Sequence, residues 1–164
     1  MTDLEFLRKP CEEVTEKINV EAMASALLHD LAKVTGAGLA ANQIHLHHKV
    51  CVIAVGLMNP IVLVNPIITK ALKPHIIEER CLSLPGLAVD IERYSYVKVK
   101  ALDIKGRKVK YTFRGTEAQC AQHEIDHLNG ILMIDHLNES DRSRAEIFLS
   151  MPVEERGFLK LPIH

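Results

Sequence analysis

The earliest clear pattern in the chain is a helical one over residues 20–34, VEAMASALLHDLAKV. Its apolar residues recur at three- and four-residue spacing, as on one face of a helix. They are Met23, Leu27, Leu28, Leu31 and Val34. Gly36 follows as a residue typical of a helix end. We therefore expect an N-terminal helix over residues 20–34.

The middle of the chain carries strand patterns instead. The segments KVCVIAVG (49–56) and VLVNPIIT (62–69) are rich in β-branched residues and are bounded by Gly or Pro. The segment YSYVKVKALD (94–103) alternates in parts, as a half-buried strand does. Lys105 and Gly106 then form a turn, and KVKYTF (108–113) is expected to pair back as a hairpin.

Two more helices are expected in the last third of the chain. One begins at Gly115 and runs to about Leu128, with Gly130 after it as a stop. Ser140 is a suitable N-cap for the other, which ends before Pro152. Because the strands cluster between helices rather than alternating with them, the order predicts an α+β fold. We expect mixed or antiparallel strands around a central helix, with N-terminal and C-terminal helices.

Length and charge narrow the class of protein. The 164 residues fit one domain, and we expect a single catalytic domain over residues 1–164. The net charge of −1 lacks the basic excess that is typical of a direct nucleic-acid partner. The chain has neither an apolar run near the ~20 residues of a membrane span nor a charged leader before an apolar segment. No membrane partner is therefore expected.

The four cysteines are Cys11, Cys51, Cys81 and Cys120, and no two of them form a CxxC pair. A protein without an export signal stays in a reducing compartment, so we expect a cytoplasmic protein. In that compartment the cysteines are thiols or metal ligands rather than disulfides.

The strongest chemical signal is H-E-x-x-H at residues 123–127. Residues four apart lie on one face of a helix, so His123 and His127 can bind a single metal ion. Glu124 lies next to a ligand, where its carboxylate can take a proton from metal-bound water. The same five residues also suit a core helix with two hydrogen-bonded histidines.

A catalytic metal site of this kind needs a third protein ligand and one open position. Met133 stands where one protease pattern has its third histidine, and His136 is out of register. Glu139 and Glu146 lie downstream at a distance that a second pattern uses, and Cys81 lies upstream in ERCLSLPG. A free cysteine is usually a small buried hydrophobe, so local spacing leaves the third ligand open.

Residues 36–43, GAGLAANQ, form a small-residue segment. By itself this segment favours a helix terminator followed by a tight turn. It lacks the third glycine and the preceding strand of a dinucleotide fingerprint. The amide of Gln43 can donate a hydrogen bond to a developing oxyanion, so the segment is also compatible with a substrate loop.

Three segments together resemble the motifs of the peptide deformylase family. They are GAGLAANQ at 36–43, ERCLS at 79–83 and QHEIDHLNG at 122–130, in the family's order. The resemblance extends from about residue 6 to about residue 138. It implies a hydrolase that removes the formyl group from the N-terminal formyl-methionine of new polypeptides.

The resemblance also implies a metal site. Cys81, His123 and His127 match the family's metal ligands, and Glu124 matches its general acid/base. The implied metal is Fe²⁺, which Zn²⁺ or Ni²⁺ can replace, and a Cys/His/His set suits iron or zinc. The implied reaction is attack of a metal-bound hydroxide on the formyl carbon.

Further residues match the substrate-binding positions of the family. The Gln43 amide and the Leu82 backbone N–H match the oxyanion hole, and Gly38 matches a residue that hydrogen-bonds the substrate backbone. Glu79 and Cys120 would lie near the methionine pocket. The implied partners are formyl-methionyl nascent peptides, with a transient contact to the ribosome.

The chain departs from the family in two places. Arg80 stands where the second motif has Gly, and its side chain would either narrow the substrate groove or point to solvent. Residues 139–164 show no close match. Some members dock on the ribosome with a C-terminal helix, but the helix expected here is short and ends before Pro152.

Two alternatives compete with a deformylase. One is a zinc metallopeptidase in which Glu146 is the third ligand. The other is a non-catalytic homologue that binds peptide N-termini and has lost turnover because of Arg80. The presence of both Glu124 and Gln43 favours an enzyme, because a binding module needs neither.

Overall fold

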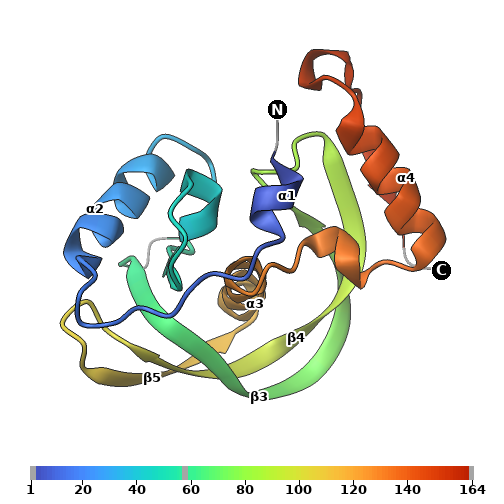
Figure 1. Ribbon diagram of the computed structural model, residues 1–164. Helices are drawn as coiled ribbons and strands as arrows, with labels where there is room; N and C mark the ends of the chain where they lie inside the picture. The colour runs from blue at the N-terminus through green and yellow to red at the C-terminus, as the bar shows by residue number, and fades with distance from the viewer. Residues whose placement is uncertain (1–2, 57–58, 163–164) are drawn as a thin grey trace.

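The computed structural model describes residues 3–56 and 59–162 (Figure 1). Its α-helices are α1 (Leu4–Leu7), α2 (Val20–Leu31), α3 (Thr116–Leu128) and α4 (Glu139–Ser150). Its strands are β1 (Gly38–Ala40), β2 (Val50–Ile53), β3 (Ile61–Arg80), β4 (Leu87–Leu102), β5 (Lys108–Arg114) and β6 (Leu159–Leu161). Short 3₁₀ turns cover Ala41–Ile44, Met133–His136 and Val153–Glu155. This composition confirms the α+β class.

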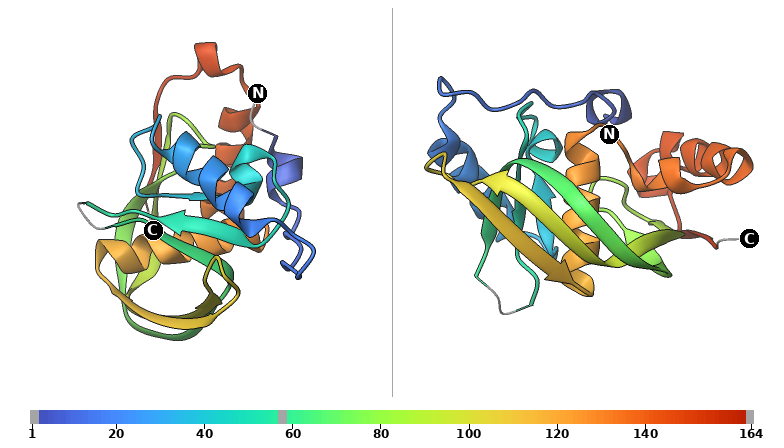
Figure 2. Two further views of the ribbon diagram at one scale, coloured as in Figure 1. Left: turned by 90° about the vertical axis from the view of Figure 1, so that its left-hand side faces the viewer. Right: turned by 90° about the horizontal axis from the view of Figure 1, so that it is seen from below.

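The strands form one mixed sheet with the order β1-β2-β3-β4-β5. All of these neighbours pair antiparallel, and β6 adds to β4 in parallel. The long strands β3 and β4 curl around α3, which lies inside the concave side of the sheet (Figures 1 and 2). The structure thus has the expected mixed α+β architecture, with a curled sheet and several helices.

Strand β2 has core on both of its faces. Val50 and Val52 belong to the cluster that contains α2, whereas Cys51 and Ile53 belong to the cluster that contains α3. Successive side chains of a strand point to opposite faces, so the two helices cover the two sides of β2. This burial explains the β-branched run in the sequence, because neither face needs polar residues.

The N-terminal helix is present but shorter than expected. Helix α2 begins after Asn19, whose side chain accepts a hydrogen bond from the backbone N–H of Ala22 at 3.0 Å, and it ends at Leu31. Of the five apolar residues, Met23, Leu27 and Leu31 are buried, whereas Val34 is exposed beyond the helix. Helical spacing therefore identified the buried face of the helix correctly, but it extended the predicted helix beyond its end at Leu31.

Strands β3 and β4 are much longer than the segments at 62–69 and 94–103. Strand β3 continues to Arg80, and β4 already starts at Leu87. Residues 70–80 contain five charged residues and a proline, and most of them are exposed. A strand that buries neither face leaves no apolar alternation, and here the pairing with β4 holds it in the sheet.

The turn expected at residues 36–43 is wrong in part. Residues 38–40 form β1, which pairs antiparallel with β2 through Gly38–Ile53 and Ala40–Cys51. All three residues are buried, so no polar alternation announced a strand. The 3₁₀ turn at Ala41–Ile44 follows and ends at His45, which has a left-handed φ of 62°.

The C-terminal region also differs from expectation. Asn138 rather than Ser140 caps α4, because its side chain accepts a hydrogen bond from the Asp141 N–H at 2.9 Å. After α4 the chain turns back and places β6 beside β4, an addition that the sequence did not predict. Within the described ranges no helix is long and apolar enough to cross a membrane.

Candidate metal centre

Helix α3 is tied to the sheet and to the 3₁₀ turn by two buried amides. Gln122 accepts a hydrogen bond from the Tyr94 N–H at 2.9 Å and donates to the Tyr94 carbonyl at 2.7 Å. Asn42 donates to the carbonyl of His127 at 2.7 Å. These bonds fix the rotation and depth of α3, so the histidines on its inner face have defined positions.

Three ligand atoms converge beside α3. His127 Nε2 lies 3.2 Å from His123 Nε2 and 3.3 Å from Cys81 Sγ, and the ligand atoms all lie within 4.8 Å of one another. Cys81 comes from the loop directly after β3, so strand pairing brings it to the helix. The cluster contains Cys81 and neither of the downstream glutamates.

This spacing fits a metal ion. Nitrogen and sulfur ligands about 2.0–2.3 Å from a tetrahedral ion lie about 3.3–3.8 Å from one another. Burial opposes ionisation of the Cys81 thiol, but hydrogen bonds with His123 and His127 lower its pKa to about 5. The thiolate is the form that binds metals, so the three residues form a site for a divalent metal ion.

Glu79 orients one of the ligands. Its Oε1 lies 2.6 Å from His123 Nδ1. Burial raises the pKa of Glu79, but hydrogen bonds from Arg93 and His123 outweigh that effect and lower it to about 2. A carboxylate can only accept, so Nδ1 of His123 carries the proton and Nε2 faces the other two ligands.

Arg93 holds Glu79 in place. Its Nε and Nη2 donate to the two oxygens of Glu79 at 2.9 and 2.7 Å, and its Nη1 donates to Asp126 at 2.6 Å. Asp126 also lies 2.8 Å from His136 Nε2. The guanidinium thereby joins β3, β4 and α3 beneath the metal site. These partners are distant in sequence, so no local pattern names them.

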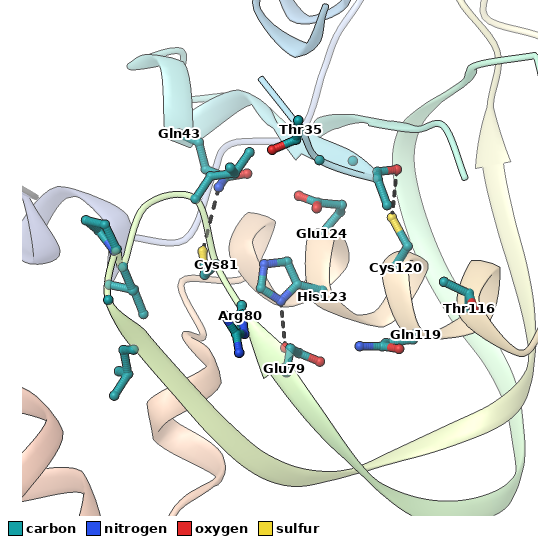
Figure 3. Close-up of a pocket in the computed structure, with 18 of the residues that line it drawn as sticks. Thr35, Gln43, Glu79, Arg80, Cys81, Thr116, Gln119, Cys120, His123 and Glu124 are labelled. Atoms are coloured by element: carbon teal, nitrogen blue, oxygen red, sulfur yellow. Dashed lines mark hydrogen bonds and ion pairs between the residues drawn. The ribbon is translucent and has the colours of Figure 1, made fainter. Parts of the chain in front are cut away.

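Glu124 points into the cavity that contains the ligands (Figure 3). It is 3% exposed, and among the described residues its Oε2 has no hydrogen-bond partner. Burial raises the pKa of Glu124 to about 7, although His123 and His127 oppose this shift. A buried carboxyl with one free oxygen beside a metal site is suited to exchange protons near neutral pH.

Gln43 presents its amide nitrogen to the same cavity. Its Oε1 accepts from the Ala40 N–H at 2.8 Å, which orients the amide group. Its Nε2 donates to Ser83 Oγ at 3.0 Å and lies 3.9 Å from Cys81 Sγ. A second donor is the backbone N–H of Leu82, the residue after Cys81. This N–H has no hydrogen-bond acceptor among residues 3–56 and 59–162.

Gly38 lies where no side chain fits. A Cβ at this position would lie 2.7 Å from Cys120 Sγ, 2.8 Å from Glu124 Oε1 and 2.8 Å from the Val52 carbonyl oxygen. Strand β1 is also the last strand at its end of the sheet, so among the described residues its outer edge has no strand neighbour. The glycine therefore lets a free strand edge run directly past the metal site.

The cavity beside the metal ligands has a volume of about 500 Å³. Glu79 and Cys120 both line it. Cys120 Sγ donates to the Ala37 carbonyl at 3.1 Å, and both oxygens of Glu79 are engaged by Arg93 and His123. Glu79 thus also supports a ligand, a part that the resemblance did not assign to it. All four cysteines are free and buried.

The metallopeptidase alternative is wrong about its third ligand. Glu146 lies on α4, where its Oε1 pairs with Arg8 Nη2 at 3.1 Å. The position on α4 follows from the packing of Ala145 and Leu149 into a second core cluster, which leaves Glu146 on the outer face. The cluster of metal-binding residues contains Cys81 instead.

Arg80 keeps an ordinary strand backbone. The described non-glycine residues with positive φ are His45, Asn65 and Lys73, so the arginine is not forced into a glycine conformation. Its side chain lines the cavity at the end of β3, next to Cys81 (Figure 3). The side chain is also 64% exposed, so Arg80 both lines the cavity and reaches solvent.

Comparison with known proteins agrees with the site. The family model for polypeptide deformylase matches residues 2–143 of the chain. The chain belongs to the peptide deformylase family. A peptide deformylase from Synechococcus sp. (strain CC9605) is 37% identical over 161 residues, which cover 94% of this chain and 77% of the relative.

Solved structures of peptide deformylases share the fold. The crystal structure of a peptide deformylase from Legionella pneumophila matches with a TM-score of 0.81 and 36% identity, and covers 88% of each chain. The peptide deformylase from Synechococcus elongatus in complex with actinonin matches with a TM-score of 0.81 and 31% identity, over 94% of this chain and 88% of that one. The unmatched part of this chain is therefore small.

Proposed function

We propose that this chain is a metal-dependent hydrolase that removes the N-formyl group from the N-terminal formyl-methionine of newly made polypeptides. The observation that carries the proposal is the Cys81, His123 and His127 ligand set beside a cavity that Cys81, His123 and Glu124 line, with one carboxyl oxygen of Glu124 lacking a partner among the described residues. Membership of the peptide deformylase family supplies the substrate class.

The proton transfers fall to Glu124. When bound, the metal supplies a water molecule of lowered pKa and polarises the formyl oxygen. Glu124 takes a proton from the attacking water at Oε2 and returns it to the nitrogen of the leaving amine. Its raised pKa suits both transfers, because the carboxyl can be charged for the first and protonated for the second.

Two N–H donors stabilise the developing charge. The Nε2 of Gln43 and the backbone N–H of Leu82 flank Cys81, so both can reach the formyl oxygen as it becomes negative. The bond from the Ala40 N–H keeps the amide oxygen of Gln43 turned away, so the donor end faces the substrate. Fixed donors of this kind need no reorganisation during the reaction.

The substrate backbone binds along β1. Gly38 lies on the free edge of the sheet, where an extended peptide can add as a further strand through backbone hydrogen bonds. The methionine side chain then enters the part of the cavity lined by Glu79 and Cys120. A formyl carbon carries only hydrogen, so the narrow space beside Gly38 accepts it while bulkier acyl groups are excluded.

Metal, partners and compartment complete the proposal. A thiolate with two imidazoles suits Fe²⁺ or Zn²⁺, and Fe²⁺ is the metal we propose, with Ni²⁺ as a substitute for assays. Formyl-methionyl nascent chains are the partners, which places the activity in the cytoplasm and near the ribosome.

The test is formate release from formyl-Met-Ala-Ser by protein purified without oxygen and loaded with iron or nickel. Glu124→Ala is the control, since it should keep the metal and lower kcat by about 10²–10⁴-fold. Release by the wild type alone supports the hydrolase. If the wild type binds metal and peptide but releases no formate, the chain is instead a binding module for peptide N-termini.

A further inference from the structure

The two departures from the family pattern meet at the mouth of the cavity. Arg80 replaces the motif glycine, and Phe158 lies beyond residues 2–143, which the family model matches. The guanidinium carbon of Arg80 lies 5.0 Å from the centroid of the Phe158 ring, within the range of a cation–π contact. Both side chains line the cavity.

The fold holds Phe158 at this position. Strand β6 pairs with β4 from Leu159 onward, and the Leu159 N–H donates to the Gly86 carbonyl at 2.9 Å. Leu161 is fully buried and anchors the end of the strand. A Cβ on Gly86 would lie 2.8 Å from the Gly157 carbonyl oxygen, so the two segments touch backbone to backbone. The ring is therefore part of the site wall.

The guanidinium of Arg80 is fixed along one edge and free along another. Its Nε and Nη2 donate to Glu78 Oε1 at 3.0 and 2.9 Å, while Glu78 Oε2 is taken by Lys160 Nζ at 2.9 Å. Its Nη1 has no partner among the described residues, and the side chain is 64% exposed. N–H groups of Arg80 that have no acceptor among the described residues therefore remain at the mouth of the cavity.

The mouth of the cavity presents a positive charge. Glu78 and Lys160 are not among the residues that line it. The two carboxyl groups that line it, Glu79 and Glu124, are 2% and 3% exposed and lie at its inner end. Arg80 is consequently the one exposed charged side chain that a peptide in the described cavity would meet.

We propose that Arg80, stacked on Phe158, is a specificity-determining residue that favours an acidic side chain over a basic one just downstream of the formyl-methionine. The inference rests on the proposed function, which puts the formyl group beside Cys81 and Glu124. The rest of the peptide leaves through the exposed part of the cavity, where Arg80, Leu82 and Phe158 form one side. The other exposed lining residues are Thr35, Gly36, Gly86 and Thr116. Arg80 directly precedes Cys81, so the first residues after methionine, at ~3.3 Å each, pass within its reach.

The experiment compares kcat/KM for formyl-Met-Asp-Ser and formyl-Met-Lys-Ser, with formyl-Met-Ala-Ser as reference. We expect an Asp:Lys ratio of about 2- to 5-fold, the size of an exposed ion pair, carried by KM rather than kcat. The ratio should fall toward one as salt is raised.

Variants of the neighbouring residues should shift the Asp:Lys ratio of kcat/KM in opposite directions. Arg80→Gln should bring the ratio to one, while Glu78→Gln should raise it, because it removes the carboxylate that competes for the guanidinium. Phe158→Ala should lower the ratio and Phe158→Tyr should keep it. An Asp:Lys ratio that is one in the wild type, or that Arg80→Gln does not change, overturns the proposal.

Binding separates this proposal from the proposed function. The dissociation constants of the Asp and Lys peptides for metal-loaded Glu124→Ala protein report selectivity without turnover. If the wild type cleaves none of the three peptides, the hydrolase is wrong, yet the ratio of these constants still decides the part of Arg80. Equal constants for the two peptides overturn it.

Discussion

At the metal centre Cys81, Glu124 and His127 are 7%, 3% and 2% exposed, whereas the side chain of Arg80 and the residue Phe158 at the mouth of the cavity are 64% and 59% exposed. The inner residues are surrounded by groups that fix them, such as Glu79 and Gln43. The mouth residues are held by one exposed ion pair and one ring contact. Burial thus fixes the positions of the residues at the metal centre. The side chains at the mouth, which would contact the variable residues of the peptide, are less constrained.

The largest effect expected is loss of the metal from the inner end. Cys81→Ala removes one of three ligands, and we expect the purified protein to lose stoichiometric metal and all activity above background. Metal content by elemental analysis is the measurement. Glu146→Ala is the matched control, since Glu146 pairs with Arg8 on the surface. If Glu146→Ala lost the metal and Cys81→Ala kept it, the metallopeptidase alternative would be supported instead.

The next effect tests the support beneath the ligands. Arg93→Met leaves Glu79 charged and buried without its partner, which should lower the free energy of unfolding by about 3–5 kcal/mol. Metal affinity should fall by about 10–100-fold, because His123 loses its orientation. Urea unfolding of the metal-free protein and metal titration measure the two effects.

Arg107→Met is the control for this prediction. Its Nε pairs with Asp103 at 2.7 Å, but the side chain is 71% exposed, so the cost should be at most about 1 kcal/mol. Equal losses in the two variants would mean that burial does not separate these ion pairs.

A smaller effect is expected at the narrow wall of the cavity. Gly38→Ala places a methyl group less than 3 Å from Cys120 and Glu124, so unfolding should become easier by about 1–3 kcal/mol. Formate release should fall with it, because Glu124 must move. Gly157→Ala is the control, since a Cβ there meets no atom within 4 Å. If Gly38→Ala changed neither the free energy of unfolding nor formate release, Cys120 and Glu124 would be able to move aside without cost.

The smallest effect on stability is expected at the mouth. Phe158→Ala removes an exposed ring and should change the free energy of unfolding by no more than about 0.5 kcal/mol. Metal content should stay the same while the preference between acidic and basic peptides decreases. Loss of metal in this variant would contradict the separation between the inner end and the mouth.

The helices were the easiest elements to predict. Helix α2 was expected because one face is apolar, and its buried residues Met23, Leu27 and Leu31 follow that face. The second half of β3 and the start of β4 were missed, because exposed residues such as Lys70 and His75 carry no apolar alternation. Strand β6 was missed because three residues are too few to form a pattern.

The residues of the candidate site also divide into those that the sequence predicted and those that it did not. His123, Glu124 and His127 lie within one helical turn, so their convergence follows from helix geometry. Cys81 entered through resemblance to family motifs and not through spacing. The partners of Arg93 and Phe158 had neither signal, because Glu79, Asp126 and Arg80 come from other strands and helices.

What the sequence by itself determined is therefore local chemistry: the H-E-x-x-H face, the motif segments and the apolar stripes of the helices. The tertiary structure alone decided which distant residues meet. Pairing of β3 with β4 carries Cys81 to α3, and the return of β6 carries Phe158 to Arg80. The physical reason is that helical contacts are set by a fixed rise and rotation along the chain, whereas contacts across a sheet depend on register and burial, which no short segment encodes.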